Sequence, residues 1–240
     1  MSEFNIEVEG GKAVRLPTAG KYCDRDIVVT ATGGGSTMDD FWDAYFTGLS
    51  FNPSTGAWDC SYAFAGRGWS DGCGKPNRTI QPRQAASMFA QTSLTDISDW
   101  DIDFSKCTSF TQMCYSAYIT KIGVVDTRGG HNLGYAFNAA NRLVEIEKVI
   151  FKDDGTQIVD SMFPGCGSLK EVRFEGVIGK NIAFSGSSLL SADSVQSIID
   201  HLKDLTGATA QTLTLHATVG AKLTEEQKAT ITAKNWTLVY

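Results

Sequence analysis

Segments of 21 to 26 residues recur along the middle of this chain, and this internal period constrains the fold more than any other feature. In the fullest copy, an apolar anchor at Phe163 is followed by Leu169 and Val172 in an L-x-x-V pattern. Related copies begin near residues 87, 112 and 135, and a degenerate copy begins near 182. The anchors fall at Phe89, Cys114, Phe137, Phe163 and Phe184.

A repeat of this length with an L-x-x-[IV] element is typical of leucine-rich repeats, in which each turn of the chain contributes one short strand. A single turn cannot bury its own apolar face, so Phe89, Leu94 and Ile97 should pack on the equivalent residues of the next turn. The sequence therefore predicts an α/β repeat fold, a leucine-rich-repeat-like solenoid with short parallel strands. Both open ends of such a stack need caps.

The segments on either side of the repeats predict these caps. An aromatic-rich helix is expected after Ser36 or Thr37, and Ser191 can cap a second helix. Strands at 212–216 and 236–240 enclose a helix opened by a capping box at Thr224 and Gln227, which predicts a β-α-β unit. Residues 4–32 alternate apolar and polar side chains as strands do, and Gly33 to Ser36 form a flexible linker by composition.

The predicted organisation therefore has four parts. They are a small β module with its Gly-rich linker at 1–35, an aromatic-rich N-terminal cap at 36–86, a leucine-rich-repeat solenoid at 87–190 and a C-terminal α/β cap at 191–240.

Nine aromatic residues lie between Phe41 and Trp69. A platform that stacks against sugar rings is one interpretation of this cluster. A hydrophobic plug that seals the end of the repeats is the other. We favour the plug, because aromatic residues at helical spacing more often form core.

Composition excludes two kinds of partner. The chain has 27 acidic and 21 basic residues, a net charge of −6, and no basic segment that could neutralise a nucleic-acid backbone. No apolar run approaches the ~18 residues that span a bilayer, so membrane insertion is not expected. The first residues lack the basic and apolar regions of a Sec signal peptide, which predicts a protein that is not exported.

The six cysteines show neither a C-x-x-C pair nor a cluster with histidine, so no zinc or redox motif is expected. Free buried thiols are favoured over disulfides, because the chain is long and shows no signal peptide.

Catalytic motifs are also missing. His131, His201 and His216 lie on different predicted elements without a nucleophile motif, and residues 176–180 lack the spacing of a P-loop. Residues 99–103 imitate half of a calcium-binding loop, but that loop needs Gly and Glu where this chain has Phe104 and Phe110. A strand with its acids outward and Trp100, Ile102 and Phe104 inward is the favoured interpretation. We expect no catalytic residue, metal or cofactor, although a carboxylate pair for glycoside hydrolysis stays open because sequence does not show carboxylate separation.

If the predicted sheet binds a ligand, the outward positions beside the buried L-x-x-[IV] residues are the candidates. The alternative is an ordinary solvated face. These candidate binding residues are Asp96, Lys121, Glu145, Glu147, Glu171 and Arg173.

The segment at 162–172 resembles the leucine-rich repeats of the BspA-like family of bacterial and bacteriophage surface proteins. Residues 41–45, 62–66 and 103–110 look like parts of tail-associated or prophage-encoded members from Gram-positive bacteria. Residues 8–22 are similar to a short N-terminal module of phage tail structural proteins. The family has no defining catalytic residues, so the resemblance implies architecture more than chemistry.

The resemblance and the two-part layout imply a non-enzymatic phage or prophage structural protein on the virion tail, made in the host cytoplasm, that recognises host surface through the solenoid. Other virion or tail proteins are the expected partners of the N-terminal module, and a host cell-surface protein or glycan is the expected partner of the repeats. Copies on a tail are usually symmetric, so a homo-oligomer such as a trimer is expected. The alternatives are a purely architectural virion accessory protein, a bacterial surface adhesin and, last, a glycan hydrolase.

Overall fold

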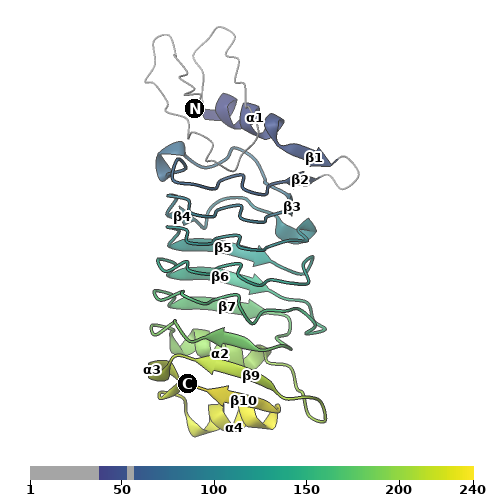
Figure 1. The fold of residues 1–240 in the computed structure, drawn as a ribbon, viewed down its shortest axis with the longest axis vertical. Coiled ribbons are helices and arrows are strands. Elements are labelled where there is room, and N and C mark those ends of the chain that lie inside the picture. The colour runs from purple at the N-terminus through teal and green to yellow at the C-terminus, as the bar shows by residue number, and fades with distance from the viewer. Residues whose placement is uncertain (1–37, 53–56) are drawn as a thin grey trace.

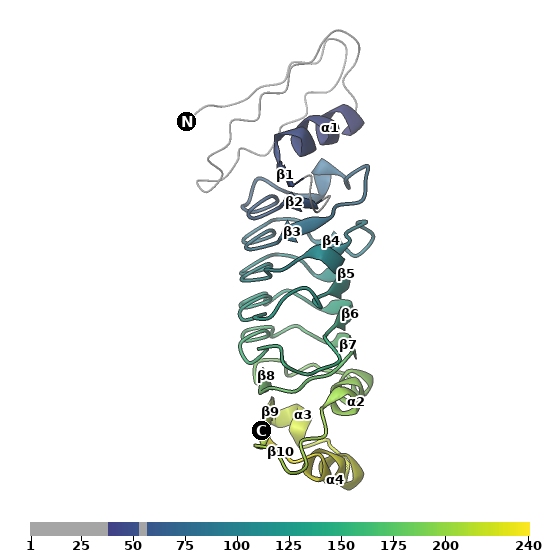
Figure 2. The same ribbon diagram turned by 90° about the vertical axis from the view of Figure 1, so that its right-hand side faces the viewer.

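The computed structural model describes residues 38–52 and 57–240, and the β module expected at 1–35 lies outside them. The described chain forms a column of successive turns with parallel strands and few helices, which places it in the α/β class (Figure 1). The strands run along one edge of this column, and tight turns run along the opposite edge (Figure 2).

The central sheet contains one strand from each turn of the chain. Its four strands are parallel and follow sequence order, which confirms the predicted strand pairing. Ile97, Ile122, Ile146 and Val172 stand in register and are all buried. The strands are β4 (Asp96–Ile97), β5 (Lys121–Asp126), β6 (Glu145–Ile150) and β7 (Glu171–Glu175).

The anchor residues form the core of the turns. All five are completely buried, as the repeat pattern predicts. The ring of Phe163 stacks on those of Phe137 and Phe184, with centroids 5.5 and 4.7 Å apart. Backbone hydrogen bonds join equivalent anchor turns, as from the Phe89 N–H to the Met113 oxygen at 2.8 Å. Each turn therefore satisfies its neighbour's polar backbone while it buries its own aromatic ring.

The N-terminal end is closed by a helix and a small sheet. Trp42, Tyr45 and Phe46 of α1 pack into a buried aromatic cluster, in which Trp42 stacks on Trp69 with centroids 5.8 Å apart. Rings buried in this way cannot lie against a sugar, so the platform interpretation is wrong for these side chains. The elements here are α1 (Met38–Gly48), β1 (Ser50–Asn52), β2 (Ala57–Asp59), the 3-10 helix η1 (Asp71–Cys73) and β3 (Pro82–Gln84).

The C-terminal end is closed by a second sheet and by helices. Ser191 caps α2, and Thr224 with Gln227 forms the predicted capping box of α4. The sheet has the parallel order β10-β9-β8 and lies on the side of the turns, whereas α2 and α4 lie below β7 (Figure 2). The elements are β8 (Ile182–Phe184), α2 (Ala192–His201), β9 (Gln211–Leu215), α3 (Ala217–Gly220), α4 (Glu225–Ala233) and β10 (Trp236–Val239).

The free edge of β7 is covered by side chains of α2. The Val172 N–H donates to the Ser194 hydroxyl and the Phe174 N–H to the Ser197 hydroxyl, each at 2.9 Å. These two serines replace the strand that a further turn would have supplied, so the parallel stack stops here without an exposed edge.

Two further expectations can be compared with the structure. The prediction of a strand at residues 99–103 is wrong. Only an isolated bridge between Ile102 and Ile80 forms, and the 3-10 helix η2 (Phe104–Lys106) follows. Asp103 caps η2 by accepting from the Ser105 N–H at 2.9 Å, which ends the extended chain. Trp100 and Phe104 are buried as expected, while Ile102 is half-buried.

The five described cysteines are free and buried, as predicted; Cys23 lies outside the described residues. No helix in the ranges that the structure describes is long and apolar enough to cross a membrane.

Candidate functional site

A row of charged side chains crosses the parallel sheet at the start of its strands. The register places Asp96 beside Lys121, Lys121 beside Glu145, and Glu145 beside Glu171. Adjacent strands are about 4.8 Å apart, so the row repeats charge at that interval across four turns. The period of the repeat creates this row, because each of the four residues immediately precedes the second buried residue of its L-x-x-[IV] element.

Hydrogen bonds and ion pairs hold most of this row in place. Lys121 Nζ lies 3.4 Å from Glu145 Oε2, and Glu171 Oε2 accepts from the Ser191 hydroxyl at 2.7 Å. Burial would raise the pKa of Asp96, but hydrogen bonds from Ser98 and the charge of Lys121 outweigh it and lower the pKa below its ordinary value. The carboxylate of Asp96 is therefore charged at neutral pH.

A second row follows one step along the strands, where Glu147 and Arg173 are exposed. Neither side chain has an ion pair within the described part of the chain. The pairing of β6 with β7 shifts here, since Ile146 faces Val172 but Val149 faces Phe174. This bulge gives β6 one extra residue between its buried positions, so both Glu147 and Lys148 reach the surface.

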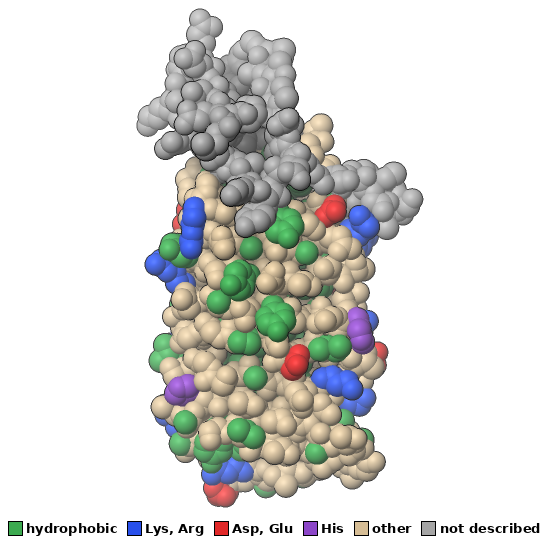
Figure 3. Space-filling model, viewed as in Figure 1, with side chains coloured by type: hydrophobic (Ala, Val, Ile, Leu, Met, Phe, Trp, Pro, Cys, Tyr) green, Lys and Arg blue, Asp and Glu red, His purple; other side chains and the backbone are tan. Residues whose placement is uncertain are grey.

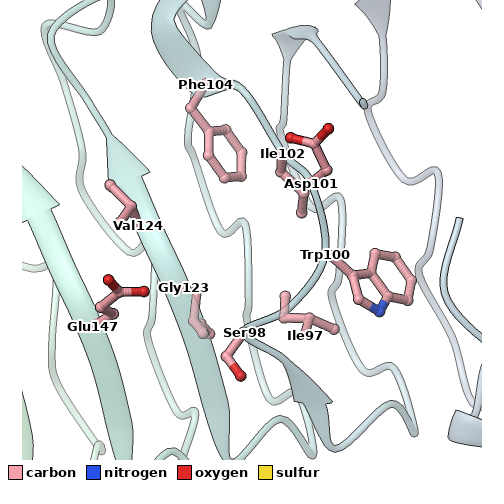
Figure 4. Close-up of a pocket in the computed structure, with 10 residues that line it drawn as sticks. Ile97, Ser98, Trp100, Asp101, Ile102, Phe104, Gly123, Val124 and Glu147 are labelled. Carbon is pink, nitrogen blue, oxygen red and sulfur yellow. The ribbon is translucent and has the colours of Figure 1, made fainter. Parts of the chain in front are cut away.

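A hollow of about 200 Å³ opens beside the second row (Figure 4). Figure 4 shows Glu147 and Val124 on one side of this hollow and Asp101 on the other, with Phe104 between them. Gly123 stands level with Glu147, where a Cβ atom would approach the Ser98 oxygen to 2.8 Å. The hollow exists because β4 ends at Ile97 and because Gly123 contributes no side chain beside it.

The structure thus brings all six predicted binding residues onto one sheet, in two adjacent rows. Sequence reasoning missed the hollow and its second carboxylate, Asp101. A glycine at 123, in the position where the next repeat has Glu147, was the available signal. The face combines apolar groups with carboxylates, which can accept hydrogen bonds from hydroxyl or amine groups of a ligand.

Other chemistry-bearing residues are dispersed. His201 Nδ1 lies 2.8 Å from the Ser197 oxygen and His216 caps α3, while His131 is exposed on a separate turn. Among the described residues, no three His, Cys, Asp or Glu side chains are grouped so as to hold a metal ion.

No family model matches this chain, and comparisons with curated proteins and with solved structures found no significant match.

Proposed function

We propose that this chain is a non-enzymatic structural protein of a phage or prophage tail, and that it recognises host surface through the β4–β7 face of a leucine-rich-repeat-like solenoid. On this proposal, the virion is its location and residues 1–35 attach it to other tail proteins.

The solenoid interpretation is supported by the regularity of the stack. Each turn supplies one strand in parallel register, each anchor is buried against its neighbours, and serines of α2 close the last strand edge. A one-dimensional stack of this kind offers a broad, rigid sheet surface that small changes in exposed side chains can adapt to a partner.

The recognition role rests on Glu147, which lines the hollow, and on Arg173 of the next strand, neither of which has an ion pair among the residues that the structure describes. Some surface charges of the sheet are paired between strands, as Lys121 is with Glu145 at 3.4 Å and Lys148 with Glu175 at 3.0 Å. Within the described ranges Glu147 and Arg173 have no such pair, and Glu147 lines the hollow together with the exposed apolar Val124. Both charged side chains can therefore bind a partner without first breaking an ion pair to a described residue.

Binding of fluorescently labelled protein to intact Gram-positive host cells tests the proposal. The variant Glu145→Ala/Glu147→Ala should reduce saturable binding about tenfold without lowering the melting temperature. A matched control, Glu225→Ala/Glu226→Ala on α4, removes the same charge elsewhere and should bind as the wild type does. Glu171 is left intact because it accepts from the Ser191 hydroxyl at the start of α2.

A form lacking residues 1–35 separates cell binding by the repeats from attachment to other tail proteins by the N-terminal residues. Cell binding retained by this form supports recognition by the repeats. If neither form binds cells but the full chain co-assembles with virion components, the architectural role replaces our proposal. Release of reducing ends from cell-wall polysaccharide would instead favour a hydrolase.

A further inference from the structure

The edge of the column opposite the strands is built from tight turns that carry almost no charge. Figure 3 views this edge, which lies at the left of Figure 2, and shows hydrophobic side chains along its middle with charged ones mainly towards its margins. Asp160 is the single charged residue in these turns, although 20% of all residues in the chain are charged. The outer surface of the turns is called the turn face here, and it is formed by residues 61–66, 86–91, 111–116, 134–139 and 160–165.

Two exposed tyrosines hold equivalent places on the turn face. The Tyr62 N–H donates to the Ala86 oxygen of the next turn at 3.0 Å, and the Tyr135 N–H donates to the Ser161 oxygen of its own next turn at 2.8 Å. Tyr62 is 42% exposed and Tyr135 is 50% exposed. They stand three turns apart, which is about 14 Å at the spacing of neighbouring strands. The half-buried Tyr115 lies between them, in the turn before that of Tyr135.

The backbone at both exposed tyrosines is left-handed, with φ of 59° at Tyr62 and 64° at Tyr135. This conformation is unfavourable for a residue with a Cβ atom, whereas glycine adopts it freely. A ring that is half exposed gains little burial energy to offset that cost, so packing alone does not account for tyrosine at position 135. Residues held in such conformations cluster at ligand sites, where the fold keeps a side chain pointing in one direction.

Uncharged hydrogen-bonding groups lie among the tyrosines. The side-chain amides of Gln91, Gln112 and Asn138 have no hydrogen-bond partner in the described part of the chain. Each amide offers two N–H donors and one acceptor oxygen, and the phenol of Tyr135 offers a further donor and acceptor. The turn face can therefore both donate to and accept from the hydroxyl groups of a ligand without contributing a charge.

This combination of groups suits an uncharged polysaccharide. The C–H groups on one face of a sugar ring can lie against the negative face of a tyrosine ring, while the sugar hydroxyls bind the amides. A sugar unit within a chain is about as long as the spacing of two turns, so a repeating ligand can meet equivalent groups on successive turns.

Two other kinds of ligand fit the turn face less well. An acidic glycan would find no lysine or arginine in these turns, and would face the carboxylate of Asp160 instead. A protein partner needs a continuous apolar centre in its interface. Here the tyrosines stand in separate turns, with polar side chains between them.

We propose that the turn face binds a neutral glycan that lies along the column. Its sugar rings stack on Tyr115 and Tyr135, and its hydroxyl groups bind the amides of Gln112 and Asn138. This inference does not rest on the recognition role of β4–β7, because that sheet lies on the opposite edge of the column (Figure 2).

Calorimetric titration of the full chain tests the proposal, with cellohexaose, maltohexaose, laminarihexaose and chitohexaose as neutral probes. We expect at least one of them to bind. Tyr135→Gly removes the ring and relieves the left-handed backbone, so it should weaken binding about tenfold without lowering the melting temperature. Tyr135→Phe keeps the ring and should retain most of the affinity, whereas Gln112→Ala/Asn138→Ala should reduce it.

Two controls change the strand edge of the column instead. Val124→Ala removes an exposed apolar side chain there, and Glu145→Ala/Glu147→Ala removes two of its charges. Both variants should bind the neutral hexasaccharide as the wild type does. Hexagalacturonate, which carries a carboxylate on each sugar, should bind more weakly than the neutral probe.

Failure of all four neutral hexasaccharides to bind would overturn the proposal, and so would equal binding by the wild type and Tyr135→Gly. A loss in Val124→Ala as large as that in Tyr135→Gly, or tighter binding of hexagalacturonate, would also overturn it. If Tyr135→Gly instead converted an oligomer to a monomer in sedimentation velocity and left the titration unchanged, the turn face would join copies of this chain and bind no glycan. The titration contains no cells, so its failure leaves the cell-binding test of the β4–β7 face intact.

Discussion

The rings of Phe163 and Phe184 stack with their centroids 4.7 Å apart and their planes 23° from parallel, although 21 residues separate them in sequence. Phe163 also stacks on Phe137, so its ring joins three successive turns of the chain. The series of stacked anchor rings is interrupted at Cys114, the one anchor that is not aromatic. Contacts between turns, rather than within them, are therefore the main source of buried apolar area here.

Replacing Phe163 tests this dependence on stacking between turns. Phe163→Ala should lower the free energy of unfolding by about 3–5 kcal/mol, because it removes a fully buried ring and leaves a cavity between two neighbours. Urea unfolding monitored by circular dichroism measures the loss. Leu189→Ala is the control, since Leu189 is 56% exposed, and it should change stability by no more than about 0.5 kcal/mol. Similar losses of unfolding free energy in both variants would show that the stacked anchor rings do not stabilise the fold.

Gly176 and Gly207 allow backbone strain to be separated from crowding between turns. Both have a φ of +79°, but a Cβ atom on Gly176 would lie 2.1 Å from the Phe151 oxygen, whereas one on Gly207 meets nothing within 4 Å. Gly207→Ala should cost only the left-handed backbone penalty of about 1–2 kcal/mol. Gly176→Ala should cost clearly more in thermal or urea unfolding, because the neighbouring turn must move. Equal losses would mean that the turns can separate without penalty at this point.

The sequence period predicted the buried anchors, the parallel strands and the caps at Ser191 and Thr224, because each depends on a residue type at a fixed spacing. The bulge in β6 and the end of the extended chain at Asp103 depend on one residue each and leave no periodic signal. The left-handed backbone conformation of Ser87 and Gln112, with φ of 53° and 55°, could not be predicted either, since neither residue is glycine. The guanidinium groups of Arg67 and Arg142 both lie over the ring of Tyr118, 3.6 and 3.9 Å from its centroid. Tyr118 and Arg142 occupy nearby positions in successive repeats, but Arg67 comes from outside the predicted solenoid, so the sequence period did not predict this contact.

The stability of the protein should depend on Asp126 in a pH-dependent way. Burial would raise the pKa of Asp126, but hydrogen bonds from Arg128 and its charge outweigh burial, so the native pKa lies below the ordinary value. On acidification the unfolded state therefore takes up this proton first. The contribution of Asp126 is complete above pH ~4 and is lost as the pH falls through the lower native pKa.

Asp126→Asn should consequently destabilise the protein more at pH 7 than at pH 3, as measured by urea unfolding at each pH. Glu226→Gln on α4 changes an exposed carboxylate and serves as the control for the general effect of removing one negative charge. If the difference in free energy of unfolding between the wild type and Asp126→Asn stayed constant or widened on acidification, the lowered native pKa of Asp126 would be contradicted.

The buried thiols should be inert until the turns around them open. Burial raises the pKa of Cys107 and of Cys166 to about 12, so at pH 8 almost none of either is the reactive thiolate. Because Cys23 lies outside the described residues, the measurement uses Cys23→Ser and a colorimetric thiol reagent. We expect negligible labelling of the native protein and reaction of all five remaining cysteines in denaturant.

An added exposed thiol provides the positive control for this experiment. Thr209→Cys, in the exposed loop before β9, should react at once in the native state and report one thiol above the background. Labelling of the buried cysteines should follow the unfolding curve measured by circular dichroism, since the reagent reaches them only when the stacked turns separate. Rapid labelling of any of the five in native buffer would show that the turns open without global unfolding, and the interior of the stack would then be more dynamic than its packing implies.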